Sequence, residues 1–117
     1  MPAVTTAAAI DVTVLKASVC AQIKDRMPDG VDTAFPASVQ RVYVWNQIKA
    51  DEIPAKIRHI YYFNGRKISD IILNVRSSFW RTWSYKSISN DRYRGQWRVD
   101  IASVDGKVLR QLYFEIK

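Results

Sequence analysis

Apolar and polar residues alternate along most of this chain, and the alternation limits the folds that are open to it. Ile10, Val12 and Val14 alternate with polar neighbours, and later segments repeat the same period of two. Successive side chains of a β-strand point to opposite faces, whereas one face of a helix recurs about every 3.6 residues. A helical period is hard to find. The sequence therefore predicts an all-β fold.

The alternation slips once, near the start of the chain. Val14 and Leu15 are both apolar, and the period of two then resumes at Ala17 and Val19. An inserted residue of this kind is typical of a β-bulge, or of a strand that crosses from one sheet to another. We expect one of these two features near Leu15.

The most specific local signal is a turn dipeptide. Asn64-Gly65 supplies the positive φ angles that a type I′ turn requires. Apolar and polar residues alternate on both sides of it. Ile57–Phe63 and Lys67–Val75 are therefore predicted to pair as an antiparallel hairpin.

Seven strands fit between the turns and loops. Residues 25–30 are a turn cluster, residues 29–38 form a loop closed by Pro36, and Asp105-Gly106 is a second tight turn. The expected strands comprise residues 10–23, 39–48, 57–63, 67–75, 79–88, 96–102 and 107–116. This number and spacing predict a seven-stranded antiparallel immunoglobulin-like β-sandwich, with a closed barrel as the alternative. The Cys-Trp-Cys framework of antibody domains is absent from the sequence.

A chain of 117 residues has the length of one domain. We expect residues 1–9 to be a flexible N-terminal segment and residues 10–117 to be a single sandwich domain. Residues 1–9 lack the basic and apolar regions of a signal peptide, and no apolar run is long enough for a membrane-spanning helix. Cys20 is the only cysteine, which excludes an intramolecular disulfide and a cysteine-based zinc site. We expect it to be a small apolar strand residue.

The formal net charge of +7 is unevenly distributed. Residues 1–38 carry three bases and four acids, whereas the rest of the chain carries 15 bases and seven acids. A basic domain attracts polyanions such as nucleic acid, acidic glycans or an anionic membrane face. The alternative is that the charge serves solubility alone.

Residues that would indicate catalysis are scarce. The sequence has no glycine-rich phosphate loop, nucleophile elbow or metal-binding motif. His59 is the only histidine, and it would act as a general base only if a nucleophile and a third group converged on it. The alternative is a half-buried strand histidine bonded to a neighbour. We expect no catalytic residue, no cofactor, no metal site and no enzymatic activity.

The best candidate for a binding site lies in the basic and aromatic segment 76–98. If Trp80 is a core residue, strand alternation places Arg81, Trp83 and Tyr85 together on the surface. Such a strip can bind sugars, bases or a partner loop by stacking and cation–π contact. In the alternative, Trp80, Trp83 and Trp97 all pack in the core and the stem of Arg81 covers them.

Two further aromatic strips are either core or an extension of the same surface. One contains Tyr43 and Trp45, and the other is Tyr61-Tyr62-Phe63. Tyrosine and tryptophan suit both settings, so the pattern leaves both open. The predicted ligand-binding residues are Arg81, Trp83, Tyr85, His59 and Trp45.

Five blocks of residues together resemble a known family. They are Val42–Ile48, His59–Gly65, Trp80–Lys86, Gly95–Val99 and Asp105–Leu109. In order and spacing they resemble a bacterial family of domains of unknown function, number 2914, over the chain from Ile10 onward. The resemblance implies a small accessory β-domain of exported or membrane-tethered proteins, hence a periplasmic or membrane-associated location. It implies no reaction, ligand or partner, and a native start at Met1 would instead imply the cytoplasm.

These observations favour a non-enzymatic binding module in a bacterial, envelope-associated assembly. Its aromatic and basic sheet face would bind a glycan or a partner protein. The first alternative is binding of nucleic acid or another polyanion through the net positive charge. The second is a purely structural subunit of an oligomer or a larger complex.

Overall fold

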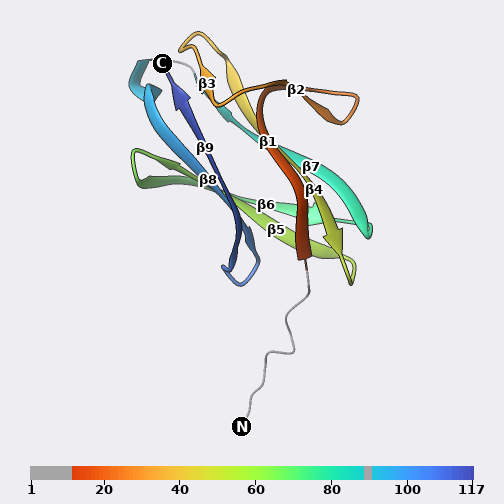
Figure 1. Ribbon diagram of the computed structural model, residues 1–117. Coiled ribbons are helices and arrows are strands. Elements are labelled where there is room, and N and C mark those ends of the chain that lie inside the picture. Colours follow the sequence, from red (N-terminus) through yellow and green to blue (C-terminus); the bar gives the residue numbers. More distant parts are fainter. Residues whose placement is uncertain (1–11, 89–90) are drawn as a thin grey trace.

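The computed structural model describes residues 12–88 and 91–117. The residues that it describes form nine β-strands and one 3-10 turn, η2 (Asp91–Tyr93), and contain no α-helix (Figure 1). The strands are β1 (Val12–Lys24), β2 (Met27–Val31), β3 (Ala34–Phe35), β4 (Arg41–Ala50), β5 (Ala55–Phe63), β6 (Arg66–Val75), β7 (Phe79–Ser87), β8 (Gly95–Ser103) and β9 (Val108–Ile116). The predicted flexible segment, residues 1–9, lies outside the described residues.

The strands form two sheets that pack face to face as a sandwich. Sheet A has the order β2-β1-β4-β7, and sheet B has the order β3-β9-β8-β5-β6. All neighbours pair antiparallel except β3 and β9, which are parallel. The predicted all-β sandwich is confirmed. Each sheet keeps two free edge strands, so the barrel alternative is wrong.

The described residues contain nine strands rather than the predicted seven, because two short strands replace the predicted loop. After a two-residue turn at Asp25-Arg26, β2 pairs back on β1. Both turn residues have positive φ, 53° and 63°; aspartate is favoured at the first of these positions, but Arg26 stands where glycine is usual. The strand β3 has only two residues, too few for a period of two to be visible.

The predicted irregularity in the first strand is a β-bulge. The pairing of β1 with β4 shifts between Val14, opposite Ile48, and Lys16, opposite Gln47. Leu15 is the extra residue and is exposed. The bulge allows Val14 and Ala17 to face the core on either side of it. Later in the same strand Cys20 is buried, as expected, and burial raises the pKa of its thiol.

The predicted hairpin at Asn64-Gly65 is confirmed. Both residues have positive φ, 48° and 83°, and Phe63 pairs with Arg66 across the turn. The turn also contacts the start of β8, where the Asn64 side-chain oxygen accepts a hydrogen bond from the backbone N–H of Gln96 over 3.1 Å.

The core fills the space between the inner faces of the sheets. Its centre is aromatic, with Trp97 and Phe114 stacked at a centroid distance of 5.5 Å. Around it lie the buried valines and isoleucines of both sheets. Trp80 is half-buried and packs against one end of this core, as its strand phase predicts.

The β5–β6 turn packs closely on the start of β8 at Gly95, and substitution of this glycine tests that packing. An added Cβ there would lie 2.8 Å from the Asn64 side-chain oxygen, whereas at Gly65 it would meet nothing within 4 Å. Both glycines have positive φ, which costs an alanine about 1–2 kcal/mol. Gly65→Ala should lose about that much free energy of unfolding, and Gly95→Ala should lose more. Urea denaturation measures both; an equal or smaller loss in Gly95→Ala would contradict the packing.

Candidate functional site

The pairing of β4 with β7 gathers aromatic and basic side chains on the outer side of sheet A. Tyr43 lies opposite Tyr85, Trp45 opposite Trp83, and so on along the pair. Because these residues share one strand phase, they share one face of the sheet. We call this surface the aromatic–basic face; it comprises Arg41, Tyr43, Trp45, Gln47, Lys49, Phe79, Arg81, Trp83 and Tyr85.

Three of these side chains are bases and none is an acid. Within the described part of the chain, no carboxylate lies within ion-pairing distance of Arg41, Lys49 or Arg81. The Arg41 guanidinium lies 4.4 Å from the ring centroid of Tyr85. The positive charge of the face is therefore not neutralised by neighbouring side chains.

Exposure varies along the aromatic–basic face. Phe79 is 61% exposed and Tyr85 is 45% exposed, while Trp83 is half-buried. The rings of Tyr43 and Tyr85 lie 5.6 Å apart at an angle of 49°. Arg41 and Tyr43 both pack against the Tyr85 ring, so the three side chains form one layer in which Tyr85 stays partly exposed.

The tip of the β1–β2 hairpin covers the middle of the face. The indole N–H of Trp45 donates a 2.9 Å hydrogen bond to the backbone oxygen of Arg26, and Trp45 is buried. The guanidinium of Arg26 lies 5.4 Å from the ring centroid of Trp80 and 5.5 Å from that of Trp83. It also donates a 3.0 Å hydrogen bond to the backbone oxygen of Arg81. Arg26 therefore holds the hairpin on β4 and β7.

The predicted site residues separate into two groups. Arg81, Trp83 and Tyr85 share the outer face of β7, as their phase predicts. Trp45 shares that face but lies buried beneath Arg26. His59 lies between the sheets and is fully buried. Neither Trp45 nor His59 is accessible to a ligand in this structure.

The third aromatic strip does not extend the face, because it belongs to sheet B. Tyr61 is buried in the core, and the ring of Phe63 packs 4.9 Å from that of Trp97. Tyr62 lies under the guanidinium of Arg98 at 4.0 Å.

A chain of hydrogen bonds crosses the core around His59. The His59 Nδ1 atom lies 2.6 Å from the Ser84 hydroxyl, and Nε2 lies 2.6 Å from the Asn46 side-chain oxygen. The Tyr61 hydroxyl lies 2.6 Å from the same serine hydroxyl. Tyr61 and His59 come from β5 in sheet B, whereas Asn46 and Ser84 come from β4 and β7 in sheet A. The chain therefore joins the two sheets.

The donors and acceptors of this chain follow one direction. The Asn46 amide nitrogen donates to the backbone oxygen of Thr82 over 3.3 Å, which leaves its oxygen as an acceptor. His59 Nε2 must then carry the proton and Nδ1 must accept from Ser84, whose oxygen accepts from Tyr61. Among the described residues, no buried side-chain nitrogen or oxygen lacks a partner.

Ser84 and Asn46 do converge on His59, but the arrangement is closed to substrates. All four side chains that form these hydrogen bonds are buried. Burial lowers the pKa of His59 to about 3 and raises the pKa of Tyr61. His59 is neutral near pH 7 and its Nδ1 atom already accepts a hydrogen bond from Ser84, so the geometry describes a structural link between the sheets.

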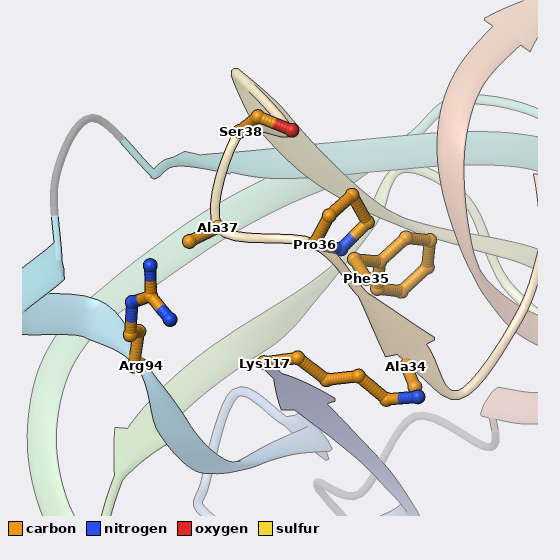
Figure 2. Close-up of a pocket in the computed structure, with 7 residues that line it drawn as sticks. All are labelled: Ala34, Phe35, Pro36, Ala37, Ser38, Arg94 and Lys117. Carbon is orange, nitrogen blue, oxygen red and sulfur yellow. The ribbon is translucent and has the colours of Figure 1, made fainter.

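An open depression lies beside β3 and Lys117. It has a volume of about 650 Å³ and is lined by Ala34, Phe35, Pro36, Ala37, Ser38, Arg94 and Lys117. Figure 2 shows Lys117 running toward Ala34, with Arg94 on the side of Ala37. The depression shares no residue with the aromatic–basic face or with the hydrogen-bond chain.

Neither a metal-binding cluster nor a membrane-spanning helix occurs in the described part of the chain. Residues 12–88 and 91–117 contain no group of three or more histidine, cysteine or acidic side chains arranged to hold a metal ion. The same residues contain no helix that is long and apolar enough to cross a membrane.

Fold and surface define an all-β sandwich domain with an exposed aromatic and basic sheet face. Residues 41–116 match a family model described as "Protein of unknown function (DUF2914)", and the chain belongs to that family. The match covers β4 to β9. β1, β2 and β3 lie outside it, as does Arg26 in the turn between β1 and β2. The match therefore starts later than Ile10, where the resemblance in sequence was expected to start. No curated protein matches the chain.

The low pKa of His59 predicts a loss of stability in mild acid. In the unfolded chain His59 has its ordinary pKa of about 6.5. Below that pH the unfolded His59 therefore binds a proton, whereas the buried His59 of the folded protein stays neutral. The free energy of unfolding should be unaffected by His59 above pH 6.5 and fall by up to about 1.4 kcal/mol per pH unit below it. Denaturation between pH 7 and 5 measures this slope, and His59→Gln should lack it. Equal slopes in both proteins would contradict the burial of His59.

Removing Arg26 should expose the tryptophans that it covers. In Arg26→Ala, acrylamide should quench the fluorescence more strongly and the emission should shift to longer wavelength, because Trp80 and Trp83 lose their cover. Arg41→Ala is the matched control, since Arg41 lies over a tyrosine. The same quenching in wild type and Arg26→Ala would show that the hairpin tip does not cover these rings.

Proposed function

We propose that this domain is a non-enzymatic interaction module whose aromatic–basic face binds an acidic surface of a partner protein. The observation that carries the proposal is the grouping of three bases without a paired carboxylate among five aromatic residues on one sheet face. Arginine, tyrosine and tryptophan are the residues that most often dominate the energy of protein interfaces.

The shape of the face favours a protein over a glycan. A sugar stacks on a free ring face, but Arg41 and Tyr43 pack against the Tyr85 ring and the Arg26 guanidinium lies over Trp83. The described depression lies elsewhere and contributes nothing to the face. A broad layer of packed rings and bases suits a flat partner surface that carries carboxylates.

Nucleic acid is the second candidate, supported by the net charge of +7. Nucleic acid would contact lysine and arginine side chains over the whole molecule rather than on one face. Its affinity for the protein would fall steeply as the salt concentration rises. A purely structural subunit is the third. The immunoglobulin-like type of the sandwich and a role in a bacterial envelope assembly stay predictions.

Variants of the face should lose partner binding while the domain stays folded. Arg81→Ala and Tyr85→Ala remove an exposed base and an exposed ring, and each should weaken binding about tenfold or more. Binding is measured by pull-down from nuclease-treated extracts of the cells that produce the protein, with thermal melts to check folding. Intact binding in both variants would overturn the proposal.

A photo-crosslinker locates the contact independently. Placed at Tyr85 it should capture the partner, whereas at Tyr113, which is 60% exposed on sheet B, it should not. Capture that nuclease abolishes would support the nucleic-acid alternative, and equal capture from both positions would contradict a specific face.

A further inference from the structure

Four strands lie at sheet edges in the described part of the chain, and they differ in how much of their outer side is open. An edge strand presents unpaired backbone N–H and C=O groups to which another strand can add. β3 has only two residues, and β2 has five, which include Pro28 and Gly30. On β7, the backbone oxygen of Arg81 is occupied by Arg26. β6, at the edge of sheet B (Figure 1), is the longest of the four at ten residues, and like β7 it has no proline or glycine. Unlike β7, it has no side chain from another described element bonded to its outward backbone groups.

The pairing of β5 shows which backbone groups of β6 point outward. The backbone N–H of Asn64 donates to the oxygen of Gln96, so even-numbered residues of β5 bond to β8 and odd-numbered residues bond to β6. The β6 partners of these odd-numbered residues are Ser69, Ile71, Leu73 and Val75. The backbone groups of Asp70, Ile72 and Asn74 therefore point away from the sheet.

The side chains around this edge are mostly basic. Ile72 is 59% exposed and pairs with Arg58, while its neighbour Asn74 pairs with Lys56. The bases on β6 and beside it are Lys56, Arg58, Arg66, Lys67 and Arg76. The one acid among them, Asp70, is already paired with both Arg58 and Lys67. Arg58 and then Lys67 lower the pKa of that carboxyl to about 2, so it stays ionised and paired.

We propose that β6 is the docking site for an extended acidic segment of a partner protein, which adds to sheet B as a sixth strand. Backbone hydrogen bonds to residues 70, 72 and 74 would hold the segment, and its carboxylates would meet the surrounding bases. A second copy of this chain fits less well, because it would bring two basic edges together. The proposal concerns a different sheet from the aromatic–basic face and does not depend on it.

A defined probe tests the edge. It is a fluorescent, end-capped peptide of alternating Val and Glu, and its binding is followed by anisotropy. The wild-type protein should bind it, and Ile72→Pro should weaken binding about tenfold or more, because proline removes an outward N–H without changing the charge. Ile72→Val keeps the backbone donor and should bind like the wild type. The same peptide with alternate amides methylated has the same charge and should bind weakly.

Controls separate folding, charge and the other face. Circular dichroism checks that Ile72→Pro is folded, and Asn74→Pro gives a second variant with an outward N–H removed. Tyr85→Ala should bind the peptide normally, so a failure of the aromatic–basic face is distinguishable from a failure here. No binding by the wild type, or undiminished binding in the folded proline variants, would overturn the proposal. A wild-type dimer in sedimentation that Ile72→Pro abolishes would show that a second copy occupies the edge.

Discussion

The hydrogen-bond chain between the sheets is the constraint on which the rest of the structure depends. Tyr61 and His59 on one sheet meet Ser84 and Asn46 on the other in the centre of an apolar core. Buried polar groups are costly when they lack partners, about 1–3 kcal/mol each. A slip of β4 or β7 by one residue would turn Asn46 or Ser84 to the opposite face and leave His59 without its partners. The hydrogen bonds around His59 therefore favour one alignment of β4 and β7 in sheet A relative to β5 in sheet B.

That register also determines what the molecule shows to its surroundings. The alternation that turns Asn46 and Ser84 inward turns Trp45 and Trp83 outward, where Arg26 covers them. The more exposed rings and bases remain on either side of the hairpin tip. Sheet A thus offers a packed aromatic and basic face, whereas sheet B offers a basic edge at β6. Both surfaces suit acidic partners, but one would bind through side chains and the other through the backbone.

Local patterns predicted much of this fold. The Asn64-Gly65 hairpin, the bulge at Leu15 and the outward position of Arg81, Trp83 and Tyr85 all follow from neighbouring residues. Arg26 could not be predicted in the same way, because its contact with Arg81 spans 55 residues and no motif marks it. The partners of His59 are also distant in the chain, so a lone histidine gives no sign that a serine and an asparagine flank it.

The state of His59 in solution tests the central link most directly. Nitrogen-detected NMR of the imidazole reports both the tautomer and the pH at which the ring gains a proton. A buried ring between Asn46 and Ser84 should be neutral with the proton on Nε2, and it should remain so on titration from pH 7 to below pH 5. An imidazole that titrates near its ordinary pKa of about 6.5, or that carries its proton on Nδ1, would contradict the account.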